Sequence, residues 1–444
     1  MLLSAKTGRV RETTPLRRLS HKFEKMKNRE VIHRLHYIIC FKKYIEQYLF
    51  GNLLTEIYVF VYLKDITRGE TNMKICILSM QRVPNFGSLL QGYSLKKIIE
   101  DLGHEVEFID IQENPDENRL LKDARKNFSF EYGCSRKKSH KIDKYIFNRI
   151  ITKKRNKDQN HLMWEFQNRI IALNKENNKK KYDCCVIGSD EVFNALNETD
   201  WGFTSQLFGN VSQADRVITY AASCGFTSYS ELPGKAKDII KTSFSKISHF
   251  SVRDNNTLEF VKKLSDKEVA INYDPVVVGD FTEEANLEAG IDNLPDKYCI
   301  VYAYHDRINN EKEIKAIKSL CKKEGMKIVS VGASQAWIKN HLVITPFQIP
   351  EVFSKAQYVV TDTFHGTIFS AKYAKKFAVI VRPSNENKLE DLLEKLNIID
   401  HKVVSINQLN DIYKKEHDLQ MMHRIEKRER DKAIQYLKNA INGN

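Results

Sequence analysis

The sequence lacks the cysteine patterns of disulfide-rich and zinc-binding proteins. It contains eight cysteines, none in a CxxC pair and none in a Cys/His cluster with zinc spacing. Several lie in apolar, strand-like runs, where a free thiol behaves as a small hydrophobic side chain. This usage favours a reducing compartment, so we expect a cytoplasmic protein without a disulfide framework.

Long apolar runs are also missing. No stretch approaches the roughly 20 apolar residues that a membrane-spanning helix needs, and the N-terminus lacks the charged-then-apolar pattern of a signal peptide. The nearest candidate, YLFGNLLTEIYVFVYL at 48–63, is short and is interrupted by Glu56. We interpret it as a buried or interfacial amphipathic helix. A peripheral contact with the inner membrane face stays open as an alternative.

The motifs of several enzyme classes do not occur. No GxGxxG follows the first expected strand and there is no GxxxxGK[ST], which weighs against an NAD-type fingerprint and a P-loop ATPase. No HExxH or GxSxG motif stands out. The lack of a DxD motif argues against the hypothesis of a metal-dependent nucleotide-sugar transferase. We therefore expect no metal and no cofactor.

The chain has 444 residues, 42% of them hydrophobic, which predicts two or three globular domains. A formal net charge of +14 favours acidic partners such as nucleic acid, anionic lipid or phosphorylated substrates, although solvated surface lysine explains much of it equally well. The basic block at 136–155 lacks a recognisable nucleic-acid-binding module, so we expect no nucleic-acid partner.

The organisation changes at Met73. Residues 1–72 are a basic, helical appendage, and whether they belong to the native protein is left open. From Met73 onward, strand-like and helix-like stretches alternate, which is typical of βαβ units with a parallel sheet. We predict an α/β fold of two Rossmann-like domains facing a cleft. The expected domains are 73–285 with a helical insertion at 114–182, and 286–444 with one long terminal helix at 411–441.

A histidine stands where an expected strand turns into a helix, in VVTDTFHGTIFSAKYAKKFAVI at 359–380. Ligands of parallel sheets bind at this edge, where Gly366 would let the backbone approach a ligand. A helix starting near Thr367 would point its free N–H groups there and hold an anion. His365 could then bind phosphate or donate a proton. The alternative is that His365 only caps the helix.

Other strand-to-helix loops repeat this logic. IGSDEVFN at 187–194 places Gly188, Ser189 and Asp190 at a strand end, where Asp190 is either a catalytic base or a plain N-cap. In SVRD at 251–254, Arg253 could bind a carboxylate or phosphate of a ligand. The alternative is that Arg253 and Asp254 form only a helix cap or a surface salt bridge. A third loop, at 81–91, is either a plain turn or a substrate loop, with four candidate contacts: Asn85, Gly87, Ser88 and Gln91. YDP at 273–275 we interpret as only a strand exit into the linker.

Taken together, these segments resemble the polysaccharide pyruvyl transferase family. The matching pieces, in the family's order, are KICILSMQRVPNFGSLLQGYSLKKIIEDLGHEVEFIDI, YDCCVIGSDEVFN, SVRDNNTLEFVKKL, YDPVVV and YVVTDTFHGTIFSAKYAKKFAVI, and they cover most of 73–400. Glu191 and Phe193 depart from the glutamine and tryptophan that the family often has. The resemblance implies a glycosyltransferase B-like fold, with His365 as the cleft histidine and Arg253 as the anion-binding arginine.

The resemblance further implies transfer of pyruvate from phosphoenolpyruvate to two sugar hydroxyls, as a ketal. The acceptor would be an exopolysaccharide, a cell-surface glycan or a lipid-linked oligosaccharide. Our hypothesis gives His365 phosphate binding and acid catalysis, Arg253 anion binding, and Asp190 the role of base, with Gly366 and Thr367 near the substrate. The alternatives are a B-type glycosyltransferase that uses a nucleotide sugar, and a non-catalytic glycan-binding or assembly protein. The sequence does not name the acceptor sugar, its hydroxyl pair or the oligomeric state.

Overall fold

The computed structural model describes residues 72–126, 142–291, 294–305, 307–383 and 385–444, with side chains omitted over 142–151. The expected N-terminal appendage and the segment at 48–63 lie outside the described residues, as do residues 136–141 of the basic block. Residues from Met73 to Asn444 belong to one compact unit, and everything below concerns that unit.

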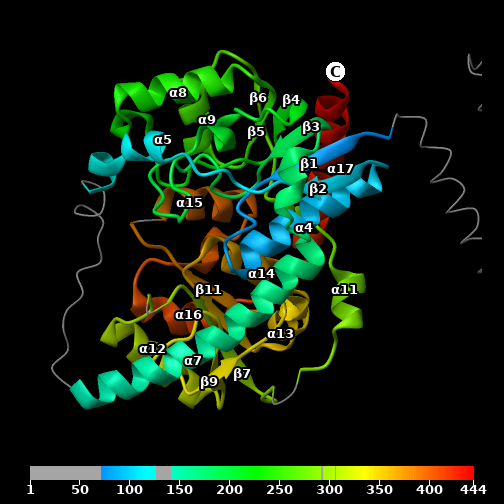
Figure 1. Ribbon diagram of the computed structural model, residues 1–444. Helices are drawn as coiled ribbons and strands as arrows, with labels where there is room; N and C mark the ends of the chain where they lie inside the picture. The colour runs from blue at the N-terminus through cyan, green and yellow to red at the C-terminus, as the bar shows by residue number, and fades with distance from the viewer. Residues whose placement is uncertain (1–71, 127–141, 292–293, 306, 384) are drawn as a thin grey trace, which may run out of the picture. The chain divides into compact units, whose positions relative to one another are not determined.

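The first sheet is parallel and has six strands in the order β2-β1-β3-β4-β5-β6 (Figure 1). Its central strands are almost wholly buried, which explains why their sequences are continuous apolar runs rather than alternating ones. The strands are β1 Lys74–Leu78, β2 Glu105–Phe108, β3 Tyr182–Ile187, β4 Ala214–Thr219, β5 Ile247–Val252 and β6 Val269–Ile271.

Helices connect these strands, as parallel pairing requires. Between β2 and β3, at 114–182, the described residues are helical or irregular and contain no further strand before β3. Helix α7 of this segment reaches the second sheet, where Arg155 donates to Ile338 O and Gln159 exchanges two hydrogen bonds with Ile344. The helices are α4 Phe86–Asp101, α5 Pro115–Arg119, α7 Ile142–Phe166, η1 Gln167–Ile171, η2 Lys175–Lys179, η3 Ser205–Phe208, η4 Tyr229–Glu231, α8 Gly234–Phe244, α9 Asn255–Lys262, α10 Pro275–Val278 and α11 Thr282–Leu287.

The second sheet is also parallel, with six strands in the order β12-β11-β10-β7-β8-β9. Its strands are β7 Tyr298–Ala303, β8 Lys327–Gly332, β9 Asn340–Leu342, β10 Tyr358–Thr361, β11 Phe377–Ile380 and β12 Lys402–Val403. Its helices are α12 Glu311–Lys323, η5 Pro346–Gln348, α13 Ile349–Lys355, α14 Phe364–Tyr373, α15 Glu386–Lys395, η6 Ile399–His401, η7 Ile406–Gln408, α16 Leu409–Tyr413 and α17 Leu419–Asn442. The two Rossmann-like sheets confirm the predicted fold class.

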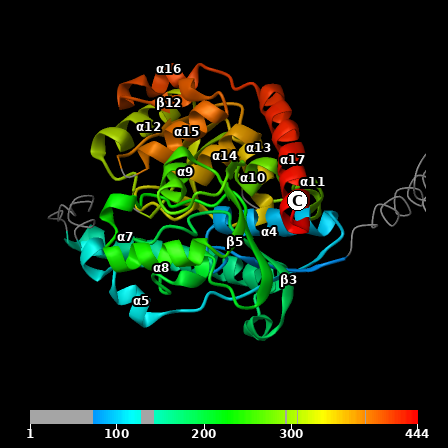
Figure 2. The same ribbon diagram turned by 90° about the horizontal axis from the view of Figure 1, so that it is seen from above.

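The expectation of one long helix at 411–441 is wrong. Helix α16 ends at Tyr413, and α17 begins only after Asp418, whose side chain accepts a hydrogen bond from Met421 N and caps the new helix. Helix α17 then returns to the first sheet, where Tyr436 Oη donates to Thr219 O at 2.9 Å (Figure 2). Helix α17 therefore follows the strands of the second sheet in sequence but packs against the first sheet.

The two halves share apolar packing. One buried cluster contains Ile77 of the first sheet, Ile300 of the second, and residues of α4, α14 and α17 such as Leu437. Each buried side chain of this size stabilises the folded chain by about 1.5–3 kcal/mol relative to an exposed one. This shared core holds the carboxyl ends of the two sheets in fixed contact, which is what positions the site.

Candidate functional site

Charged side chains from both halves meet at the carboxyl ends of their strands. Asp190 follows β3, Arg253 follows β5 and Asp274 follows β6, whereas His365 lies in the first turn of α14, directly after β10. All four are buried. The structure thus brings together the three predicted catalytic and anion-binding residues, and adds a fourth that the sequence reading dismissed.

Asp274 is the centre of this cluster. Its Oδ2 lies 2.7 Å from Arg253 Nη1, 3.1 Å from Ser189 Oγ and 3.6 Å from His365 Nε2, while its Oδ1 accepts from Val276 N. Burial by itself would raise the pKa of Asp274, but His365 and Arg253 outweigh it and lower that pKa well below its usual range. The interpretation of YDP as a mere strand exit is therefore wrong.

Arg253 is held between two carboxylates. Besides Asp274, it reaches Asp190, with Nη2 3.3 Å from Oδ1, and its guanidinium carbon lies 4.2 Å from the centre of the Phe364 ring. Burial by itself would lower the pKa of Arg253, but the charges of Asp190 and Asp274 outweigh burial and raise that pKa above its usual value. The side chain is 2% exposed, so its charge is fixed in place rather than presented on a surface.

Asp190 is the more accessible of the two carboxylates. Its side chain is 12% exposed against 0% for Asp274, and its Oδ2 accepts a 2.7 Å hydrogen bond from Ser88 Oγ. The loop before it is tightly built. Gly188 adopts φ +128°, and a Cβ there would lie 2.2 Å from Tyr220 O, so only glycine fits this turn.

His365 is not a helix cap. The N-cap of α14 is Thr363, whose side chain accepts from Gly366 N at 3.0 Å, so the helix begins at Phe364 rather than near Thr367. Packing requires a glycine at position 366, because a Cβ there would lie 2.2 Å from Thr361 Oγ1. The capping alternative for His365 is excluded, and its imidazole is directed at Asp274.

The loop at 81–91 supports the cluster from the first half. Asn85 caps α4 by accepting from Ser88 N, and Gln91 accepts from Ser189 N at 3.1 Å. A Cβ at Gly87 would lie 2.0 Å from His365 Cγ. The start of α4 and the imidazole are thus in direct contact, and glycine is required for their approach. Thr367, by contrast, donates to Thr363 O inside its own helix.

Glu191 adds an ion pair between the halves. Its Oε1 lies 2.7 Å from Lys388 Nζ of α15, and its Oε2 accepts from Asn194 Nδ2. Burial would raise the pKa of Glu191, but Lys388 outweighs it and lowers the pKa to about 2. The sequence reading noted Glu191 only as a departure from the family pattern and missed Lys388 altogether. Neither residue stands in a motif that would have revealed their contact.

A second charged group lies at the edge of the second sheet. Asp362, fully buried after β10, lies 3.3 Å from both Arg307 Nε and Arg382 Nε, and Arg382 also binds both oxygens of Glu313. Burial raises the pKa of Asp362, and the two arginines oppose that shift. These contacts tie the ends of three connections into one rigid edge beside α14.

Three further observations bear on chemistry and location. Among the described residues, no group of three or more His, Cys, Asp or Glu side chains is placed to hold a metal ion. No helix in the described part of the chain is both long and apolar enough to cross a bilayer. The six described cysteines are free and buried: Cys76, Cys184, Cys185, Cys224, Cys299 and Cys321.

Fold and site together define a two-sheet α/β protein whose charged centre is assembled from loops of both halves. The sequence profile of the polysaccharide pyruvyl transferase family matches residues 85–385, which include all four residues of the cluster. The chain belongs to that family, and the family description indicates a transferase. No curated protein matches the chain in a direct sequence search.

The solved structures that a structural comparison matches to this chain are distant in sequence. A Staphylococcus aureus MnaA–UDP complex is 11% identical with a TM-score of 0.42, covering 84% of this chain and 97% of its own. Arabidopsis thaliana UGT89C1 complexed with UDP-L-rhamnose is 10% identical with a TM-score of 0.43, covering 84% and 99%. A UDP-GlcNAc 2-epimerase from Neisseria meningitidis, bound to UDP-GlcNAc, is 10% identical with a TM-score of 0.40, covering 84% and 100%.

Proposed function

We propose that the protein transfers the pyruvyl unit of phosphoenolpyruvate to two hydroxyls of a sugar, forming a ketal on a cell-surface glycan, an exopolysaccharide or a lipid-linked precursor. The observation that carries this proposal is the contact of His365 and Arg253 with the same Asp274 oxygen, at 3.6 and 2.7 Å. His365, Arg253 and Asp274 are thereby joined in one cluster within the family's matched region. The proposal includes a cytoplasmic location and needs no metal or cofactor.

The reaction balances with phosphate as the second product. A proton adds to the methylene carbon of the donor, which leaves positive charge at the central carbon. One sugar hydroxyl adds there and loses its proton. The phosphate group then leaves with its bonding electrons, and the second hydroxyl takes its place and loses its own proton. The protein has to deliver one proton, accept others and stabilise the charge that develops.

The cluster divides these tasks. His365 delivers the proton or binds the donor phosphate, and the fixed carboxylate of Asp274, 3.6 Å from its Nε2, orients its ring. Asp190, held by Ser88 Oγ, accepts a proton from the acceptor hydroxyl. Arg253 contributes the cation that binds the donor's carboxylate or phosphate. To do so, it has to give up its contact with the Asp190 carboxylate in exchange for one with the donor.

Incubation with phosphoenolpyruvate and a nitrophenyl glycoside tests the proposal. Release of inorganic phosphate together with a product mass increased by one pyruvyl ketal supports it. A hexose gained from a nucleotide sugar would assign a glycosyltransferase instead. No product from either donor, with acceptors of several sugar types, would leave a glycan-binding or assembly protein.

The variant His365→Ala should abolish phosphate release, because it removes the imidazole that lies 3.6 Å from Asp274 Oδ2 and is the proposed proton donor. The matched control is His423→Ala, since His423 is exposed on α17. Circular dichroism and the melting temperature establish that both variants are folded. Full turnover by the His365→Ala variant would remove this residue from the mechanism.

A further inference from the structure

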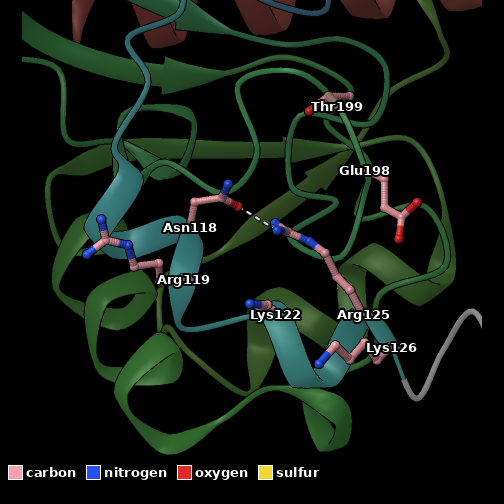
Figure 3. Close-up of a pocket in the computed structure, with 7 residues that line it drawn as sticks. All are labelled: Asn118, Arg119, Lys122, Arg125, Lys126, Glu198 and Thr199. Atoms are coloured by element: carbon pink, nitrogen blue, oxygen red, sulfur yellow. Dashed lines mark hydrogen bonds between the residues drawn. The ribbon is translucent and has the colours of Figure 1, made fainter.

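A second polar site lies in a cavity of about 410 Å³ beside helix α5 (Figure 3). Its volume lies within the range of small-molecule binding sites. Four of its lining side chains are cationic and one is acidic, so the cavity attracts anions. The lining residues are Asn118, Arg119, Lys122, Arg125, Lys126, Glu198 and Thr199.

The wall of this basic pocket is built by specific contacts. Arg125 Nη1 donates to Asn118 Oδ1 at 2.5 Å, and its Nη2 donates to Ala195 O at 3.0 Å. The same Asn118 oxygen accepts from Phe203 N at 3.0 Å. Figure 3 shows Arg125 reaching toward Asn118 from the neighbouring helical turn, with Glu198 and Thr199 on the loop opposite. The geometry of Arg125 is therefore fixed before any ligand arrives.

One loop joins the basic pocket to the cluster around His365. That loop begins with Asp190 and Glu191, and Asn194 in it hydrogen-bonds Glu191 at 2.7 Å. The next residue, Ala195, is the one whose carbonyl Arg125 holds. A ligand in the pocket thus sits at the far end of the loop that carries the proposed base.

Two of the pocket's exposed cations form surface ion pairs. Arg119 lies 3.2 Å from Asp116 and Lys126 lies 3.6 Å from Asp123, and in both pairs the side chains are at least 67% exposed. Exposed pairs of this kind contribute little free energy, so a multivalent anion can displace them. Phosphate fits best, because arginine binds it with paired hydrogen bonds and lysine adds charge.

We propose that the basic pocket binds a phosphate group carried by the acceptor, so that the substrate class is a phosphate-bearing saccharide. This inference rests on the proposed function, because it assumes that a sugar acceptor binds on the side of the site where Asp190 lies. Two sources share this chemistry: a sugar linked through diphosphate to a lipid, and a saccharide with a phosphate monoester. The pocket is separate from the donor site at His365 and Arg253.

Calorimetric titration of the full-length protein tests the proposal, with inorganic pyrophosphate, glucose 1-phosphate and phosphoenolpyruvate as probes. The double variant Arg119→Gln, Lys122→Gln should raise the Kd for pyrophosphate or glucose 1-phosphate by about tenfold or more, because two charge-assisted contacts are lost. Its Kd for phosphoenolpyruvate should stay within about twofold of wild type. The matched control is Lys315→Gln, Lys322→Gln on α12, which removes the same charge from exposed positions in the other half.

Each result decides something. Tighter binding of pyrophosphate than of glucose 1-phosphate assigns the diphosphate-linked source, and the reverse order assigns the monoester. If wild type binds neither pyrophosphate nor glucose 1-phosphate, or if the double variant binds them as tightly as wild type, the proposal that the basic pocket binds phosphate is overturned. Selective loss of phosphoenolpyruvate affinity also overturns it, because the pocket would then hold the donor. Since these are binding measurements, they test phosphate binding in the pocket even where pyruvyl transfer fails. Failure of that transfer would refute the proposed function and the assignment of the phosphate to an acceptor, but not the binding of phosphate by the pocket.

Discussion

Replacing Asp274 by asparagine should destabilise the fold as well as stop catalysis. The variant keeps the size of the side chain but removes the charge that faces Arg253 at 2.7 Å in a fully buried position. Arg253 would retain only its 3.3 Å contact with Asp190 and would face a neutral amide instead. Breaking a buried pair outright costs about 3–5 kcal/mol, and we expect the lower end of that range here because Asp190 still compensates part of the buried charge of Arg253.

The pH dependence has a definite sign. The folded-state pKa of Asp274 is lowered, because His365 and Arg253 outweigh the effect of burial. Its contribution to stability is therefore fully present above the unfolded-state pKa, about 4, and is lost as the pH falls from there toward the folded-state pKa. The gap in unfolding free energy between wild type and the asparagine variant should be constant near neutral pH and should narrow below about pH 4.

Urea unfolding followed by fluorescence measures this gap, with phosphate release as a second readout. The matched control is Asp280→Asn, since Asp280 is exposed and its acceptance from Thr282 N is a role that asparagine also fills. The control should change the free energy of unfolding by less than about 1 kcal/mol. An Asp274→Asn variant as stable as that control would refute the assignment of Asp274 as the buried counter-ion of Arg253.

Two other experiments test how the halves meet. Gly87→Ala should lower kcat by about tenfold or more while Gly234→Ala does not, because a Cβ at Gly87 would lie 2.0 Å from His365 Cγ whereas one at Gly234 has open space. Equal activity in both glycine variants would contradict this contact. A double-mutant cycle of Glu191→Gln and Lys388→Met in urea should give a coupling energy of about 1–3 kcal/mol near neutral pH, declining as the pH falls from about 4 toward 2. A coupling near zero would mean that this ion pair does not join the halves.

Sequence reasoning reached the fold because each buried parallel strand leaves a continuous apolar run. KICIL and YDCCVI have strand-like sequences for that reason, and both form interior strands of the first sheet. It reached His365, Asp190 and Arg253 because each follows such a run, where parallel sheets place their ligand sites. What it could not supply was pairing across sequence distance.

Asp274 shows what the missing signal was. In YDP, the aspartate caps a short helix whose first residue is Pro275, a combination typical of a helix start rather than of an open linker. That pattern could have placed a helix N-terminus beside the other strand ends. It would still not have revealed His365, because the contact joins residues 91 positions apart and depends on how the two sheets pack. Lys388 carries no local pattern at all.

The arrangement of charges in the cluster predicts an order of events in the proposed reaction. Arg253 is shared by two carboxylates, so a doubly acidic donor can approach it only where one of them gives way. Asp274 is the fixed one, with a 2.7 Å contact and no exposure. Asp190 has the longer contact, 3.3 Å, and a separate hydrogen bond from Ser88 to hold it in place. A donor that takes over Arg253 Nη2 would therefore free an Asp190 oxygen to act as base, so that donor binding prepares the site for the acceptor.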